Sequence, residues 1–238
     1  MRWKRLDGLF LHSCRSKTPR TVLRLEQTII FPGSFDPVHN GHVSLTRHVA
    51  SIEMISEVWI MPSRRNPLKS HGVYASDSDR LEMLRLATNG FKDIRVSDIE
   101  LSLPYPSYTY RTLQELKQRF PDRNFRLLIG SDNWLSFNKW WHAVDIIQEF
   151  GLMIYPRPGY EITIPDNLRE DVILLKETPV FPYSSTQVRE ILAADKDTTG
   201  ILDSKVKEYI YTKGLYSNAN TEATCTSTFH HCNGENKV

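Results

Sequence analysis

The ten residues from Gly33 to His42, GSFDPVHNGH, constrain the fold more than any other part of this chain. Residues 28–31 (TIIF), just before them, are short, apolar and β-branched, as in a buried strand. Residues 43–49 (VSLTRHV), just after them, carry apolar side chains at helical spacing. The segment is therefore predicted to be the turn that connects a strand to the start of a helix.

The beginning of a helix is suited to binding an anion such as phosphate. Its first backbone N–H groups have no partner within the helix, and the helix dipole places partial positive charge there. Gly33 and Gly41 allow the backbone to approach a ligand closely. His39 and His42 are three residues apart, so both rings lie on one face if they belong to the first turn. The pattern predicts a phosphate-binding loop over residues 33–42, called the phosphate loop below. The alternative is an Asp-Pro turn followed by two surface histidines.

A second block, residues 184–189 (SSTQVR), is typical of a helix start, because hydroxyl side chains precede the apolar residues Val188, Ile191 and Leu192. Taken alone, it predicts an ordinary capped helix. The chain contains neither a G-x-x-x-x-G-K-[ST] nor a G-x-G-x-x-G sequence. The phosphate loop is thus neither a Walker loop nor a dinucleotide-type fingerprint.

Together the two blocks resemble the nucleotidylyltransferase superfamily, whose members move a nucleoside monophosphate from a triphosphate onto a phosphate acceptor. The first matches the pattern G-[ST]-F-D-P-x-H-x-G-H, and the second is similar to the S-S-T-x-x-R signature that holds the triphosphate. The resemblance implies that His39 and His42 act at the transferring phosphate and that Arg189 holds the pyrophosphate. It implies ATP binding by Gly33, Ser34, Phe35, Gly41, Ser184, Ser185 and Thr186.

Further segments resemble nicotinate-nucleotide adenylyltransferases of the bacterial type. Residues 59–63 (WIMPS) and 66–69 (NPLK) look like the strand and loop that place a lysine, here Lys69, beside the phosphates. Residues 155–159 (YPRPG) resemble the turn beside the adenine, which implies ATP binding by Arg157. The resemblance therefore adds Lys69 to the catalytic residues.

The acceptor nucleotide is expected at two other segments. Residues 107–113 (SYTYRTL) are similar to the family's helix start near the acceptor, and residues 128–132 (LIGSD) with Lys139-Trp140 are similar to its I-G-x-D turn and K-W pair. A flat indole suits a pyridine ring, with offset stacking worth about 1 kcal/mol. Trp134 and Trp141 are expected to pack locally, Asp36 to cap its loop and Asp132 to contact a ribose. The resemblance implies acceptor binding by Ser107, Tyr108, Thr109, Gly130, Asp132 and Trp140.

The order of strand and helix patterns predicts an α/β fold with a Rossmann-like, doubly wound parallel sheet. Apolar β-rich runs at 28–31, 57–61, 125–129 and 151–155 alternate with helical patterns at 42–54, 77–89, 110–119 and 184–194. Ligands of such sheets bind beyond the carboxyl ends of the strands, where the phosphate loop and the turn at 130–132 would lie. The fold therefore gathers the motifs at one edge of the sheet.

One domain is expected, over residues 28–216. Residues 1–27 form a basic extension with seven Lys and Arg against two acidic residues. This extension is either a targeting leader or the result of a translation start assigned too far upstream. Residues 217–238 are polar and are predicted to be a disordered tail. Cys225, His230, His231 and Cys232 in that tail lack the paired spacing of a zinc site. The only other cysteine, Cys14, lies in the extension, so a reducing cytoplasm is expected.

The predicted function is transfer of AMP from ATP onto nicotinate mononucleotide, giving deamido-NAD and pyrophosphate. Mg²⁺ is expected with ATP and needs few protein ligands, so no metal site is assigned. A net charge of +2 does not suggest a nucleic-acid partner, and no apolar run in the extension is long enough for a membrane span. The sequence leaves open whether the chain forms a homo-oligomer. The alternatives are an adenylyltransferase with another acceptor, such as nicotinamide mononucleotide or phosphopantetheine, and a non-catalytic nucleotide sensor.

Overall fold

A six-stranded parallel sheet forms the centre of the computed structural model, which describes residues 26–64 and 75–217. The strand order is β3-β2-β1-β4-β5-β6, and every neighbouring pair is parallel. The order reverses between β1 and β4, which makes the carboxyl ends of these two strands the natural place for a ligand. The strands are β1 Gln27–Gly33, β2 Ile55–Pro62, β3 Ile94–Val96, β4 Asn124–Gly130, β5 Leu152–Tyr155 and β6 Val172–Leu174.

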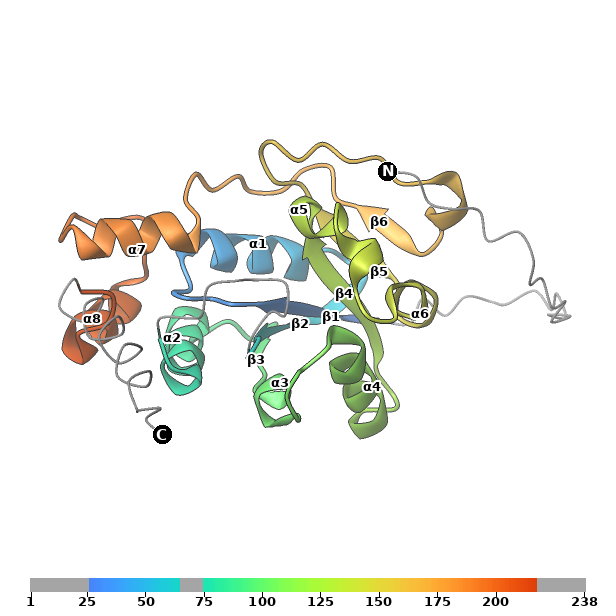
Figure 1. Ribbon diagram of the computed structural model, residues 1–238, viewed down its shortest axis with the longest axis horizontal. Coiled ribbons are helices and arrows are strands. Elements are labelled where there is room, and N and C mark those ends of the chain that lie inside the picture. The colour runs from blue at the N-terminus through green and yellow to red at the C-terminus, as the bar shows by residue number, and fades with distance from the viewer. Residues whose placement is uncertain (1–25, 65–74, 218–238) are drawn as a thin grey trace, which may run out of the picture.

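Helices cover both faces of this sheet (Figure 1). The α-helices are α1 Asn40–Ala50, α2 Asp77–Thr88, α3 Ile99–Ser102, α4 Thr109–Arg119, α5 Ser131–Trp134, α6 Ala143–Glu149, α7 Ser185–Ala193 and α8 Ser204–Lys213, and the 3₁₀ helices are η1 Phe137–Lys139 and η2 Asp166–Leu168.

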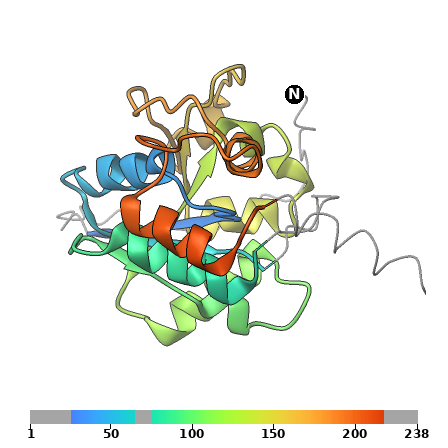
Figure 2. The ribbon, with the colours of Figure 1, turned by 90° about the vertical axis from the view of Figure 1, so that its left-hand side faces the viewer.

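Two apolar cores follow from the alternation of side chains along the strands. In β1, Ile29 and Phe31 pack with residues of α1, α2, α7 and α8, whereas Ile30 packs with residues of α3, α4, α5 and α6. Figure 2 shows α8, in red, lying along α2, where the Tyr209 hydroxyl donates to Asp79 Oδ1 at 2.9 Å. Both sheet faces are thus buried, which explains why the strands are apolar runs.

The predicted fold class is confirmed, and so are the four predicted strands. β3 and β6 were missed because each has only three residues, and the helices α3, α5, α6 and α8 were missed as well. α1 begins at Asn40 and ends at Ala50 rather than spanning 42–54. Most of both proposed terminal segments, with the three cysteines, lies outside the described residues, so the domain limits stay predictions. Within 26–64 and 75–217, no helix is long and apolar enough to cross a membrane.

Candidate active site

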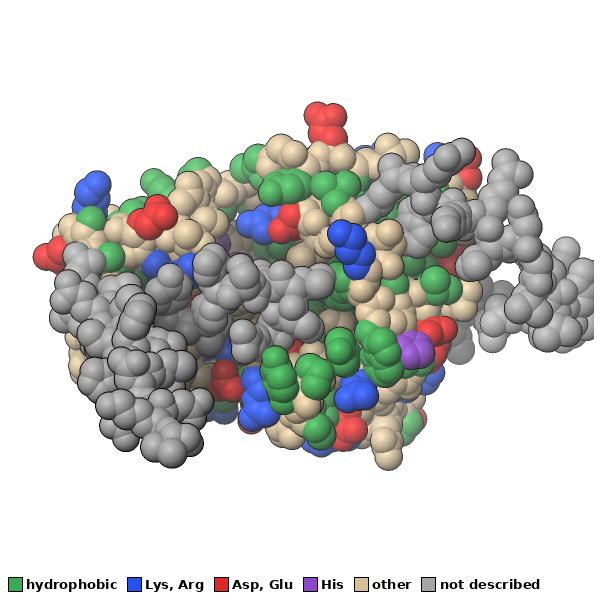
Figure 3. Space-filling model, viewed as in Figure 1, with side chains coloured by type: hydrophobic (Ala, Val, Ile, Leu, Met, Phe, Trp, Pro, Cys, Tyr) green, Lys and Arg blue, Asp and Glu red, His purple; other side chains and the backbone are tan. Residues whose placement is uncertain are grey.

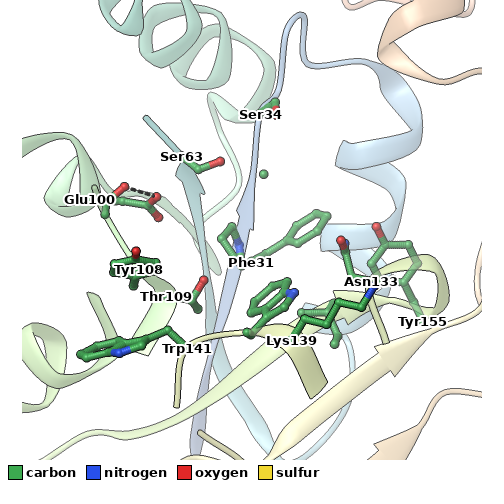
Figure 4. Close-up of a pocket in the computed structure, with 16 residues that line it drawn as sticks. Phe31, Ser34, Ser63, Glu100, Tyr108, Thr109, Asn133, Lys139, Trp141 and Tyr155 are labelled. Atoms are coloured by element: carbon green, nitrogen blue, oxygen red, sulfur yellow. Dashed lines mark hydrogen bonds between the residues drawn. The ribbon is translucent and has the colours of Figure 1, made fainter. Parts of the chain in front are cut away.

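A cavity of about 320 Å³ opens at the carboxyl ends of β1 and β4. Figure 4 shows side chains from several segments around it, with Glu100 and Tyr108 on one side and Lys139 and Tyr155 on the other. Its wall includes seven of the residues predicted from the sequence: Gly33, Ser34, Ser107, Tyr108, Thr109, Gly130 and Trp140. The structure therefore brings part of the phosphate loop and most of the predicted acceptor residues to one cavity.

His39 and His42 lie at the start of α1 with their rings stacked. His39 is the N-cap residue, and the ring centroids are 3.7 Å apart with planes at 28°. The backbone N–H of His39 donates to Nδ1 of His42 at 3.3 Å, which leaves Nε2 of a neutral His42 ring to carry the proton. The expectation that both rings share one face of the helix is confirmed.

His39 is buried, with 6% of its surface exposed, and it is uncharged at neutral pH. Burial, with a smaller effect from the positive charge of Arg157, lowers its pKa to about 4. Phe181, from the segment before α7, stacks on the other face of the ring at 5.1 Å. A Cβ atom at Gly41 would lie 2.5 Å from the Phe181 ring, so only glycine leaves room for this packing. Phe181 was missed because no local pattern marks it.

Asp36 anchors the phosphate loop to three distant parts of the chain. Its Oδ1 atom accepts from the Tyr216 hydroxyl at 2.6 Å and from the backbone N–H of Ala75 at 3.1 Å. Its backbone carbonyl accepts from the Arg189 guanidinium at 2.6 Å. The preceding Phe35 has a φ of 47°, which non-glycine residues rarely adopt, so the loop conformation depends on such anchors.

The start of α7 meets the start of α1, as the two sequence blocks predicted. Ser184 caps α7 by accepting from the backbone N–H of Gln187 at 3.3 Å. Ser185 donates to the backbone carbonyl of Pro37 at 3.0 Å. Thr186 Oγ1 accepts from Arg189 at 3.2 Å. Two helix N-termini therefore face the same region, which favours a polyanion there.

Asp132 and Arg157 form an ion pair between α5 and the turn after β5. The guanidinium Nη1 donates to Asp132 Oδ2 at 2.8 Å, and the backbone N–H of Arg157 donates to Ser131 Oγ at 2.9 Å. A Cβ atom at Gly130 would lie 2.9 Å from Arg157 Cδ and even closer to Asp132, so the glycine is required for this approach. The structure thus places Asp132 against Arg157, outside the cavity wall.

Trp140 and Trp141 both line the cavity, which corrects part of the expectation for Trp141. Trp141 does pack locally, 5.2 Å from the Tyr108 ring, yet it is 40% exposed at the cavity. Figure 3 shows exposed hydrophobic side chains, in green, gathered on this face of the molecule. Trp134, by contrast, is 1% exposed and packs against Phe137 as expected.

Three of the predicted site residues have a buried polar side-chain atom without a hydrogen-bond partner. In the described part of the chain there are five such side-chain atoms, and they include His39 Nδ1, Asp132 Oδ1 and Trp140 Nε1. Unsatisfied buried polar groups are rare in folded proteins because each costs about 1–3 kcal/mol. All three belong to residues that the sequence predicted for the site, and Trp140 lines the cavity, so a polar ligand could satisfy such atoms.

Several cavity residues were missed from the sequence, above all Glu100. It follows the short strand β3, whose three residues gave no detectable pattern. Tyr155 was predicted at the end of a strand and the start of a turn but was given no role of its own, and burial raises the pKa of its hydroxyl to about 12. Lys69, predicted beside the phosphates, lies outside the described residues. Among the residues described, no group of three His, Cys, Asp or Glu side chains could hold a metal ion.

The fold and the cavity are those of a nucleotide-binding α/β protein, and the family described as Cytidylyltransferase-like matches residues 30–191. A Bacteroides fragilis protein named "Probable nicotinate-nucleotide adenylyltransferase" is 41% identical over 187 residues, covering 77% of this chain and 90% of its own. The Bacillus subtilis nicotinate-nucleotide adenylyltransferase is 33% identical, covering 79% and 96%. The chain therefore belongs to the nicotinate-nucleotide adenylyltransferase family.

Solved structures agree with this fold. The Plasmodium falciparum nicotinic acid mononucleotide adenylyltransferase complexed with NaAD superposes with a TM-score of 0.65 at 20% identity, covering 80% of this chain and 97% of its own. A putative nicotinate-nucleotide adenylyltransferase from Vibrio parahaemolyticus gives a TM-score of 0.60 at 22% identity, covering 82% and 97%. At these identities, the likeness supports the architecture alone.

Proposed function

We propose that this chain is an adenylyltransferase that moves AMP from ATP onto nicotinate mononucleotide, giving deamido-NAD and pyrophosphate. One observation carries the proposal: a single cavity runs from Gly33 and Ser34 of the phosphate loop to Ser107–Thr109 and Trp140. This geometry allows an acceptor nucleotide to be held with its phosphate directed toward the phosphate loop. The family to which the chain belongs carries out nucleotidyl transfer.

In the proposed reaction, the 5′-phosphate oxygen of nicotinate mononucleotide attacks the α-phosphorus of ATP in line, and pyrophosphate leaves. A new P–O bond forms as the bond from the α-phosphorus to the bridging oxygen breaks, so no covalent enzyme intermediate is required. The protein contributes orientation and stabilisation of charge on the phosphate oxygens. These contributions require hydrogen-bond donors at fixed positions near the phosphates.

His42 is the proposed donor to the transferring phosphate. Its Nδ1 atom accepts from the backbone of His39, so Nε2 carries the proton of the neutral ring and is the nitrogen that would donate to a phosphate oxygen. His39 is stacked on it and buried, and its low pKa keeps the ring neutral at pH 7. In this role a neutral His39 serves as a hydrogen-bond donor through one nitrogen rather than as a cation.

Arg189, with Lys69, is proposed to hold the pyrophosphate. In the structure the Arg189 guanidinium donates to Asp36 and Thr186, which holds it at the junction of α7 and the phosphate loop. Ser184, Ser185 and the first N–H groups of α7 would contact the same phosphates. Mg²⁺ would arrive with ATP as part of the substrate, bound by phosphate oxygens and water.

The indole of Trp140 is proposed to stack on the pyridine ring of the acceptor. It lines the cavity and is half-buried, as a stacking platform must be. Ser107, Tyr108 and Thr109 line the cavity wall that leads into the start of α4. We assign these three residues to binding of the same nucleotide.

The test is pyrophosphate release by the purified protein with ATP and Mg²⁺, with nicotinate mononucleotide and nicotinamide mononucleotide offered in separate reactions. The proposal expects rapid release with the acid and slow release with the amide. Equal rates would contradict the preference for the acid. Release with neither acceptor, while ATP still binds, would favour a nucleotide-binding role without transfer.

A further inference from the structure

Glu100 is a buried carboxyl in the cavity wall that the proposed reaction leaves without a role. It lies in α3, just after the carboxyl end of β3, and is 5% exposed. Among the described residues that line the cavity, it is the only acidic one. Figure 4 shows its side chain beside Ser63, on the side of the cavity opposite Lys139.

The Glu100 carboxyl connects two walls of the cavity. Ser107 Oγ donates to Glu100 Oε1 at 3.1 Å, and the backbone N–H of Arg64, just beyond β2, also donates to the carboxyl. Ser107 begins the segment 107–109, which we assign to the acceptor nucleotide. The carboxyl is therefore placed to fix that segment relative to the end of β2.

The two arginines near Glu100, Arg80 and Arg64, form ion pairs with another residue, Asp77. Arg80, which is fully buried, pairs with Asp77 at 2.6 Å and donates to the Ser34 carbonyl at 2.7 Å. Arg64 pairs with Asp77 at 3.5 Å. Across residues 26–64 and 75–217, no Lys or Arg forms a salt bridge with Glu100. An ionised Glu100 would thus face the cavity with no cation of its own among the residues that the structure describes.

A second negative charge in this cavity is costly. Nicotinate mononucleotide carries a phosphate dianion near pH 8, while its ring carboxylate is balanced by the positive pyridinium nitrogen, so the nucleotide is a net anion. Like charges repel strongly at the lower dielectric of a protein interior. Burial raises the pKa of Glu100 to about 7, although Ser107, the Arg64 N–H and Arg80 lower it and Asp77 raises it further. A protonated carboxyl still accepts a hydrogen bond from Ser107, so the wall keeps its shape.

We propose that Glu100 is a positioning residue for the acceptor nucleotide, which fixes Ser107 and takes up one proton from solvent when the anionic acceptor binds. This inference rests on the proposed function and deepens it. The bound state retains a proton that the free protein loses as the pH rises through 7, so acceptor affinity falls above that pH. Between pH 7 and 8.5 we expect the acceptor Kd to rise roughly tenfold.

The test is titration calorimetry at pH 8 with nicotinate mononucleotide and no ATP, in two buffers that differ in ionisation enthalpy. We expect the wild-type protein to take up close to one proton per acceptor bound. Glu100→Gln should take up almost none, and its acceptor Kd should stay nearly constant between pH 7 and 8.5. Binding by wild type with no proton uptake, or undiminished uptake by Glu100→Gln, would overturn the inference.

The matched control is Glu149→Gln. Like Glu100, Glu149 accepts hydrogen bonds from side chains, here from Tyr110 at 2.8 Å and Gln114 at 2.9 Å in α4, but it does not line the cavity. This variant should keep the wild-type proton uptake, and a loss of uptake there would contradict the assignment to Glu100.

Two further measurements keep the inference testable if Glu100→Gln does not fold. In the first, the wild-type protein should take up far fewer protons per acceptor bound at pH 5.5 than at pH 8, because Glu100 is already protonated at pH 5.5. Equal uptake at the two pH values would overturn the proposal. Ser107→Ala should raise the KM for the acceptor more than the KM for ATP, and equal changes would contradict the positioning role. A wild-type protein that does not bind nicotinate mononucleotide would instead contradict the proposed function itself.

Discussion

The proposed phosphate side and the proposed acceptor side of the site are built in different ways. The phosphate side is one continuous stretch of sequence, residues 33–42, supported by α7 and by Tyr216 through hydrogen bonds to Asp36 and Pro37. The acceptor side is assembled from short segments after β3, before α4, after β4 and in η1. The proposed phosphate contacts would therefore depend on local backbone geometry, whereas the proposed acceptor contacts would depend on where the sheet brings distant side chains together.

The largest effect is expected for His42→Ala on the phosphate side. Loss of one donor to charged oxygens in the transition state should lower kcat by about 100-fold, with a smaller change in the KM for the acceptor. The measurement is steady-state pyrophosphate release. His48→Ala is the control, because His48 lies in the last turn of the same helix, away from the stacked His39 and His42 at its start, and it should retain wild-type kcat. A similar kcat for both variants would contradict the role of His42.

The pH dependence of stability should reveal the buried His39. Its pKa is about 4 in the folded protein and about 6.5 when unfolded, so the unfolded state binds more protons between these values. Stability is therefore lost as the pH falls through this window, by about 2 kcal/mol between pH 7 and 4.5.

Urea unfolding of wild type and His39→Asn at both pH values checks this expectation. The asparagine variant should lose about 2 kcal/mol less than wild type over that interval, because asparagine binds no proton. Equal losses would show that His39 is not held in its neutral form by the fold.

Trp140→Ala tests the acceptor side. Loss of the stacking surface should raise the KM for nicotinate mononucleotide about tenfold, or about 1.4 kcal/mol, while the KM for ATP changes little. The two constants are measured in the same variant, so each serves as the control for the other. If both constants rise together, Trp140 does not act on the pyridine nucleotide alone.

The smallest effect is expected from Tyr216→Phe, which removes only the hydroxyl that binds Asp36. We expect a decrease in kcat of roughly threefold to tenfold, because the phosphate loop loses one anchor. Tyr209→Phe is the matched control, since it removes a Tyr–Asp hydrogen bond of 2.9 Å between α8 and α2. The Tyr209→Phe variant should lower stability without changing kcat. Equal kcat values for the two variants would contradict the claim that the Tyr216 hydroxyl supports catalysis by anchoring the phosphate loop.

The local structure of the proposed phosphate side could be predicted because it is encoded by residues that are close in sequence. A strand, a turn and a helix start follow one another within residues 28–49, and the stacked histidines follow from helical spacing. The α7 block was also recognisable, since its capping residues Ser184 and Gln187 are close in sequence. Local rules of this kind do not require knowledge of the tertiary structure.

The acceptor side was predicted only where family motifs named its residues. Glu100 depends on β3, which is too short to give a periodic pattern, and on its long-range position beside Arg64 and Ser107. Phe181 reaches His39 across 142 positions in the sequence through a segment without regular structure. Such contacts are set by the order of strands in the sheet, which the sequence pattern alone does not specify.

The most direct test of the central claim is the yield of dinucleotide per pyrophosphate, measured by chromatography after incubation with ATP, Mg²⁺ and nicotinate mononucleotide. A cavity that holds both substrates for in-line transfer predicts one deamido-NAD for each pyrophosphate, and little dinucleotide with nicotinamide mononucleotide. Pyrophosphate released without an equal amount of dinucleotide would contradict transfer between the two sides of this cavity.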